Sequence, residues 1–414
     1  MPSALASGTD TIFDWNMNVT PPKDYAEWGQ LVEAFARHIL DRYGLEEIRS
    51  WYFEVWNEPN LSGFWTGSKE DYWKLYEASA CALKKVDSGL RVGGPASSKA
   101  NWITDIITHC HQNQISLDFV STHLYPQDEY VDYKDRQGSP HEIGRFFSDT
   151  VRRVQSEVRQ SSMPDLEIHW TEWNTLSTGS SARISWTDNS AVDSLLAAAL
   201  ICDICTDLDD AADTLCWWVA SDVFEESGLP QSEFSCTYGL TTLHGLPKAS
   251  YHAFEFLNRL RGPRLSLESD LPMPLGCGAV ATQEGDSLQI LLWHRQVLEL
   301  QNPSDWNLNL HLPPLPSPSI MLESRIQAGA GSAWETWREL GSPQTLSPLE
   351  MRLIRSHAQP AMRLTSPGTT NTFSLKPGEV LHLEIRPQGS PALPKSNLRH
   401  ALADWEQRMS GKSK

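Results

Sequence analysis

The chain has 414 residues, 40% hydrophobic and 21% charged, which is typical of a globular protein long enough for two domains. Its formal net charge of −18 argues against nucleic acid or an anionic membrane surface as a partner. No apolar run is long enough to span a bilayer, and the seven scattered cysteines show neither a disulfide framework nor zinc-finger spacing. We therefore expect no membrane span, no metal and no cofactor.

Strand-like and helix-like segments alternate five times over residues 1–263. The expected strands lie at 51–56, 90–95, 117–124, 166–174 and 214–219, and the expected helices at 25–43, 69–86, 102–112, 146–160, 190–208 and 248–261. Gly44 supplies a helix stop, and Ser68 to Asp71 form a capping box. Such alternation indicates parallel βα units, whose strands gather their carboxyl ends at one edge.

Five units do not close an eight-stranded barrel. At roughly 30 residues per unit, a complete barrel needs roughly 90 to 100 more residues ahead of Met1. We expect an α/β fold, a (β/α)8 TIM barrel that lacks about its first three strands, over residues 1–263. Short alternating runs separated by Pro, Gly and Ser turns predict a β-sandwich domain over residues 264–388, and residues 389–414 form a polar tail.

Two of the predicted strands end in a glutamate that has tryptophan and asparagine as neighbours. Glu58 follows Trp56 and Asn57 and precedes a proline that must end the strand, and Glu172 stands before Trp173 and Asn174. A parallel barrel would bring these two carboxylates together. The alternative is that both are ordinary acids that face solvent.

With both acidic strand ends in view, the chain resembles glycoside hydrolase family 39, the group of β-xylosidases and α-L-iduronidase, from Met1 to about Pro387. The resemblance rests on the residues at 18–25, 53–60, 171–174, 221–226, 334–337 and 341–343. The β-xylosidase branch looks closer. The resemblance implies that Glu58 is the acid/base and Glu172 the nucleophile of a retaining hydrolase that removes terminal β-D-xylosyl residues by double displacement.

Other residues near these strand ends are candidates for substrate binding. They are Asn57, His123, Tyr125, Trp217, Glu225 and Glu226. Asn57 can donate to the sugar 2-hydroxyl, a contact that strengthens in the transition state. Of Trp217 and Trp218 at most one faces the pocket, because side chains alternate along a strand.

For the remaining candidates a structural reading stays open. We expect His123 on substrate hydroxyls and Tyr125 hydrogen-bonded to Glu172, but both can instead be core residues. Glu225 and Glu226 can bind hydroxyls or be exposed loop acids. Glu54 points to the same face of the strand as Glu58, and we expect it to be a buried acid behind the site. We interpret His244 as a structural residue.

Two other functions compete with a β-xylosidase. An iduronidase-like hydrolase needs cations for the sugar carboxylate, and the pocket segments are poor in Lys and Arg. A barrel without its first strands can also be an inactive fragment that binds carbohydrate or serves as an interaction protein. The expected partner is a small oligosaccharide or glycoside; a homo-oligomer is compatible with the sequence. The location stays open: no signal peptide is visible, which leans toward the cytoplasm, but an N-terminus that looks truncated makes this absence uninformative.

Overall fold

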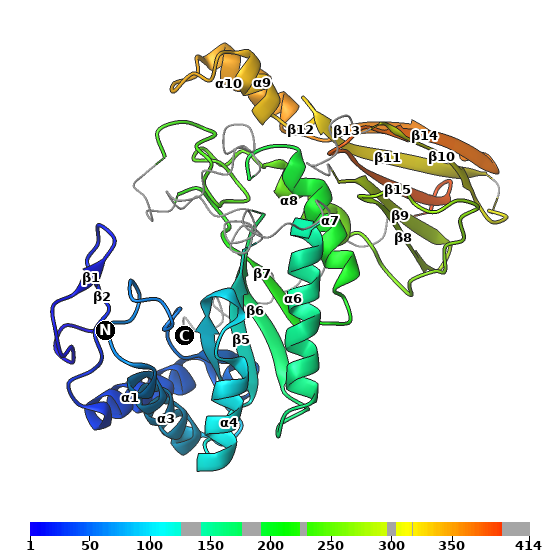
Figure 1. Ribbon diagram of the computed structural model, residues 1–414. Helices are drawn as coiled ribbons and strands as arrows, with labels where there is room; N and C mark the ends of the chain where they lie inside the picture. Colours follow the sequence, from blue (N-terminus) through cyan, green and yellow to red (C-terminus); the bar gives the residue numbers. More distant parts are fainter. Residues whose placement is uncertain (126–141, 176–191, 224–229, 296–303, 317, 391–414) are drawn as a thin grey trace, which may run out of the picture. The chain divides into compact units, whose positions relative to one another are not determined.

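The computed structural model describes residues 1–125, 142–175, 192–223, 230–295, 304–316 and 318–390. The chain divides into two compact units (Figure 1). The first contains Met1–Asn189, Ile204–Gln231 and Cys236–Gly239, and the second contains Ser190–Asp203, Ser232–Ser235 and Leu240–Lys414.

The first unit is built on a five-stranded parallel sheet whose strands lie side by side in chain order. The strands are β3 (Tyr52–Glu54), β4 (Arg91–Ser97), β5 (Phe119–Leu124), β6 (Glu167–Trp173) and β7 (Thr214–Trp217). All six residues of β5 are buried, whereas β3 and β7 alternate with exposed positions. This is expected of a parallel sheet that helices cover, in which the central strand is buried on both faces. The α/β prediction with successive parallel strands is confirmed.

Two helices of the first unit, α1 (Tyr25–Tyr43) and α3 (Lys69–Val86), begin where the sequence provides a side-chain cap. The unit also contains α2 (Leu45–Arg49), α4 (Ile103–Asn113) and α6 (Glu142–Arg159). A 3-10 turn, η1 (Ser98–Ala100), lies between β4 and α4. Asp24 caps α1, and Ser68 and Asp71 form the predicted capping box of α3. Helix α7 (Leu196–Asp207) begins within the second unit and ends within the first.

The sheet is curled rather than flat. Strands three places apart in a flat sheet lie about 14 Å apart, at about 4.8 Å per strand. Yet Thr171 on β6 donates a 2.7 Å hydrogen bond to Glu54 on β3, and Tyr52 on β3 donates one of 2.5 Å to Glu167 on β6. These contacts across the concave face give the half-barrel curvature that brings the strand ends together.

The expectation that Glu54 is buried is wrong. Glu54 is exposed, because β3 is an outer strand of the described sheet and no strand in the described residues pairs with its other edge. The hydrogen bond from Thr171 is therefore made on a water-accessible part of the concave face.

The second unit is mostly antiparallel. Its larger sheet contains β8 (Cys277–Glu284), β9 (Ser287–His294), β11 (Ser319–Ala328), β12 (Gly331–Ser332), β13 (Ala361–Thr365) and β15 (Val380–Pro387), and its smaller sheet β10 (Trp306–His311) and β14 (Thr370–Leu375). One hydrophobic cluster takes residues from both sheets, such as Leu292 and Leu383 from the larger and Phe373 from the smaller. The sheets therefore share a core.

Three helices accompany these sheets, namely α8 (Ala249–Leu257), α9 (Trp334–Glu339) and α10 (Pro348–His357). The last two were not expected, because short helices between strands carry little periodicity. Helix α8 belongs with the second unit, which resumes at Leu240, although the domain prediction placed it before the boundary at 263.

No helix in the described part of the chain is long and apolar enough to cross a membrane. A short hairpin completes the first unit: β1 (Thr11–Ile12) pairs with β2 (Met17–Asn18) in antiparallel fashion. Residues 391–414 of the predicted polar tail lie outside the described residues.

Candidate active site

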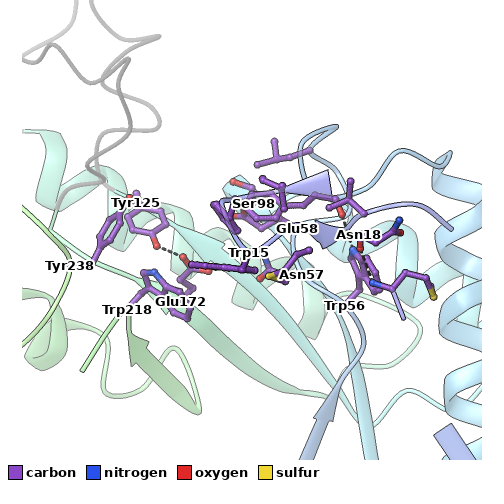
Figure 2. Close-up of a pocket in the computed structure, with 17 residues that line it drawn as sticks. Trp15, Asn18, Trp56, Asn57, Glu58, Ser98, Tyr125, Glu172, Trp218 and Tyr238 are labelled. Atoms are coloured by element: carbon purple, nitrogen blue, oxygen red, sulfur yellow. Dashed lines mark hydrogen bonds between the residues drawn. The ribbon is translucent and has the colours of Figure 1, made fainter. Parts of the chain in front are cut away.

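A pocket of about 610 Å³ opens at the carboxyl ends of the parallel strands. It is lined from the strand ends by Trp56, Asn57, Glu58, Leu61, Phe64, Ser98, Tyr125, Glu172, Trp218 and Tyr238, and from the N-terminal hairpin by Met1, Ile12, Phe13, Trp15, Met17, Asn18 and Val19 (Figure 2). All of these residues belong to the first unit. Parallel barrels carry their sites at this end, because the loops after the strands converge there.

Glu58 is held by the loop that follows β3. Its backbone N–H donates a 2.8 Å hydrogen bond to the carbonyl of Ala96 at the end of β4. Both Trp56 (φ 70°) and Glu58 (φ 43°) have left-handed backbones, an unfavourable conformation for residues with side chains. The loop thus places an almost completely buried carboxylate, 7% exposed, beside the pocket.

Glu172 is turned toward the pocket by irregularities in β6. The register shifts between Thr122 and His123 where β5 pairs with β6, and between Trp170 and Trp173 where β6 pairs with β7. Such bulges re-aim a side chain near a site. Tyr125 donates a hydrogen bond to the Glu172 carboxylate, which is the functional one of the two readings that the sequence left open for this residue.

His123 lies between the two carboxylates. Its Nδ1 is 3.1 Å from Glu58 Oε1 and 2.9 Å from Glu172 Oε2. One oxygen of each carboxylate and a ring nitrogen of His123 all lie within 4.8 Å of one another. The curled sheet therefore brings together two glutamates that are far apart in sequence.

These contacts change the protonation of the neighbouring groups. Burial alone lowers the pKa of His123, but the hydrogen bonds and negative charges of Glu172 and Glu58 outweigh it and raise the pKa to about 10. Burial, and next the charge of Glu172, raises the pKa of Tyr125 well above its usual value. At neutral pH the site thus holds a protonated His123 between the two glutamates and a neutral Tyr125 phenol that donates to Glu172.

Glu58, His123 and Glu172 are also the described residues that could hold a metal ion. A metal needs the unprotonated imidazole, whereas the two carboxylates favour the protonated one. The three side chains thus satisfy one another by hydrogen bonds, which lowers their affinity for a cation.

The structure places the remaining candidates differently from one another. Asn57 lines the pocket, but His123 lies behind the carboxylates and is not among the residues that line it. Trp218 lines the pocket in place of Trp217, whose ring packs against Trp173 at 5.1 Å and whose Nε1 donates to the carbonyl of Tyr238. Alternation allowed only one of the two to face the pocket, and the pairing of β7 with β6 selects Trp218: Trp217 pairs with Trp173, and the N–H of Trp218 donates to the Trp173 carbonyl at 2.9 Å.

Glu225 and Glu226 lie outside the described residues. His244 pairs with Glu233 in the second unit, in line with the structural reading.

Sequence reasoning missed several residues of the site. Asn174 donates hydrogen bonds to the carbonyls of Trp218 and Tyr238 and so fixes two pocket residues that come from different loops. The hairpin residues around Trp15 were also missed, since a two-residue strand has no detectable period. The available signal in the sequence was the clustering of Phe13, Trp15 and Met17 within five residues.

Paired carboxylates in a pocket at the carboxyl ends of parallel strands are the arrangement found in glycoside hydrolases. Comparison with known proteins gives the family: the chain belongs to glycosyl hydrolases family 39, whose description matches residues 1–372. The chain is a glycosidase.

Three relatives illustrate the likeness. The chain is 36% identical over 399 residues to a beta-xylosidase of Geobacillus stearothermophilus, covering 93% of this chain and 75% of that one. It is 37% identical over 395 residues to a beta-xylosidase of Caldicellulosiruptor saccharolyticus, covering 93% and 78%. The crystal structure of a monomeric beta-xylosidase from Caulobacter crescentus superposes with a TM-score of 0.78 at 29% identity, covering 94% and 80%. The predicted family, and the nearer likeness to its β-xylosidases, are confirmed.

Proposed function

We propose that the chain is a retaining exo-β-xylosidase with Glu172 as nucleophile and Glu58 as acid/base. The observation that carries this proposal is the approach of the two carboxylates, with one oxygen of each within 4.8 Å of the other. Retaining glycosidases hold their carboxyl groups about 5–5.5 Å apart, whereas inverting enzymes leave about 6.5–9.5 Å for a water molecule. The geometry favours direct attack over an intervening water.

In the first step a Glu172 oxygen attacks the anomeric carbon of the xylosyl residue. The bond from that carbon to the leaving oxygen breaks, and protonated Glu58 donates its proton to this oxygen. The products are a covalent xylosyl ester on Glu172 and a free alcohol. The hydrogen bond from Tyr125 holds the attacking carboxylate in place.

In the second step water attacks the anomeric carbon. Glu58, now a carboxylate, removes a proton from this water, and the bond to Glu172 breaks to release xylose with its original configuration. His123, 3.1 Å from Glu58, holds the Glu58 carboxyl group in position for this step.

A neutral sugar fits the pocket better than an iduronide. None of the described lining residues is a lysine or an arginine. A sugar carboxylate would therefore be transferred from water beside Glu58 and Glu172 without a side-chain cation, which is unfavourable.

The test uses 4-nitrophenyl β-D-xyloside with Glu172→Ala and Glu58→Ala. Each substitution should lower kcat at least about a thousandfold or leave it dependent on added azide. Azide should rescue Glu172→Ala with formation of α-xylosyl azide, and Glu58→Ala with formation of β-xylosyl azide, because only the second still forms the ester.

Glu70→Ala, at an exposed glutamate in the first turn of α3, is the matched control and should behave like the parent. Azide products of the opposite configuration would reverse the two roles. An inert parent on this xyloside and on the iduronide would overturn the proposal.

We further propose that β3 to β7 are five strands of a (β/α)8 barrel and that the two sheets of the second unit form a β-sandwich. The hydrogen bonds between β3 and β6 across the concave face support the barrel, and the shared hydrophobic cluster supports the sandwich.

A further inference from the structure

We propose that the hairpin β1–β2 and the loop after Glu58 form an apolar wall that binds the leaving group of the substrate. The enzyme would thus use xylosides of aromatic alcohols, and Trp15 would set this preference. The inference rests on the proposed function and extends it to the leaving group.

The lining of the pocket is chemically uneven. Most of its polar side chains come from the strand ends, with Asn57, Glu58 and Glu172 among them, and the lining amide from the hairpin, Asn18, is engaged with the Gly8 carbonyl and Thr20. Its apolar wall is formed by Ile12, Phe13, Trp15, Met17, Leu61 and Phe64. A xylosyl residue needs hydroxyl partners, which the first group provides and the second does not. The wall is therefore suited to a different part of the substrate.

The hairpin is shaped to present this wall. Phe13 (φ 61°) and Asn16 (φ 55°) have left-handed backbones, which compress the turn between β1 and β2. The Phe13 ring contacts Trp15 at 5.0 Å and Phe64 at 5.9 Å between centroids, so that it joins the hairpin to the loop after Glu58. Large aromatic rings normally bury most of their surface, yet Trp15 is 40% exposed and Met17 is 50% exposed. Part of the surface of each of these two side chains is therefore open to the pocket.

The wall is tied to the acid/base rather than to the nucleophile. The N–H of Leu61 donates to the carbonyl of Glu58, and the N–H of Phe64 donates to that of Leu61. Trp56 Nε1 donates a 3.0 Å hydrogen bond to the Phe64 carbonyl. The N–H of Thr66 donates a 3.1 Å hydrogen bond to the carbonyl of Val19, which follows β2 directly. These hydrogen bonds therefore connect the loop after Glu58 with the hairpin.

The acid/base protonates the oxygen of the leaving group, so the leaving group departs on the side of Glu58. The nucleophile has other neighbours, since Tyr125 donates to Glu172 and Tyr238 packs near Tyr125 at 6.2 Å. The apolar wall thus lies where the leaving group must be accommodated.

Such a wall discriminates between leaving groups. An aromatic ring against Trp15 buries apolar surface on both partners. A second xylose could also stack its C–H face on an indole, but its hydroxyls at the ring edge would meet Ile12, Leu61 and Phe64, which offer no hydrogen-bond partner, and this lowers its gain from the wall. An aromatic alcohol is the chemical class that fits.

The experiment measures kcat/KM of the parent and of Trp15→Ala on benzyl β-D-xyloside and on xylobiose. Comparing each variant with the parent on the same substrate cancels the intrinsic reactivity of the leaving group. Trp15→Ala should lose about tenfold on the benzyl xyloside and less than about twofold on xylobiose. Trp15→Phe keeps an aromatic face and should recover most of the loss, which separates the wall from a folding defect.

Tyr43→Ala is the matched control, because Tyr43 is 44% exposed and is not among the lining residues. It should leave both substrates unchanged. Equal losses of Trp15→Ala on both substrates, or no recovery in Trp15→Phe, would overturn the role of the wall while the proposed function stands. A parent that hydrolyses neither substrate would overturn the proposed function and this inference with it.

Discussion

At the scale of single residues, the site depends on one histidine shared by two acids. His123 is 2% exposed and contacts both Glu58 and Glu172 through Nδ1. Its positive charge stabilises negative charge on this pair of acids in a pocket that is partly shielded from water. His123 is therefore a positioning residue in this structure, behind the groups that would touch the sugar.

The raised pKa of His123 makes stability depend on pH. Because the folded pKa is about 10 and the unfolded value about 6.5, the extra stability is fully present below pH 6.5. This stability is lost as the pH rises from 6.5 through about 10, because in that range His123 keeps its proton in the folded protein but not in the unfolded chain. In urea unfolding between pH 6 and 10, the parent should lose on the order of a few kcal/mol that His123→Gln does not lose. Identical pH slopes for the two proteins would contradict this linkage.

At the scale of elements, the loops and bulges at the strand ends decide which side chains reach the pocket. The register shift near Thr122 and His123 and the left-handed backbone at Glu58 both interrupt regular strands. The helices that support these strands have strong local signals instead. Ser68 and Asp71 satisfy each other's backbone N–H groups at the start of α3.

Removing this cap should weaken α3 measurably. Ser68→Ala loses the acceptor for the Asp71 N–H, and we expect the free energy of unfolding to fall by about 1 kcal/mol in urea titrations. Ser50→Ala is the control, because its hydroxyl only donates to the carbonyl of Glu47 after α2. Its effect should stay within about 0.5 kcal/mol. Equal effects of the two substitutions would argue against the cap.

At the scale of the whole molecule, the chain passes repeatedly between its two compact units. The segment Ser190–Asp203 belongs with the second unit although it precedes part of the first. A buried ion pair ties it there: Lys248 Nζ lies 2.5 Å from Asp193 Oδ1, and both side chains are 0% exposed. Breaking one partner of such a pair leaves an uncompensated buried charge.

Lys248→Met should therefore destabilise the second unit by about 3–5 kcal/mol, measured as a lower urea midpoint. The double substitution Lys248→Met with Asp193→Leu should regain most of this loss, since two apolar side chains leave no charge behind. A double variant as unstable as the single one would show that the lysine stabilises the unit by packing instead.

The sequence predicted the parts of the molecule that local patterns encode. The apolar runs before Glu58 and Glu172, the helix stop at Gly44 and the cap at Ser68 each leave a signal within a few residues. The family could be recognised from short segments such as 53–60 and 171–174 for the same reason. The same segments identified Glu58 and Glu172 as the candidate catalytic pair.

The tertiary structure alone decided how these residues meet. Whether Glu54 is buried depends on what lies beside β3, and the choice of Trp218 over Trp217 depends on the pairing of β6 with β7. The bridging position of His123 and the wall around Trp15 depend on sheet curvature and on a hairpin too short to have a period. Contacts between distant segments carry no local signature in the chain, because they arise from packing and not from the order of neighbouring residues.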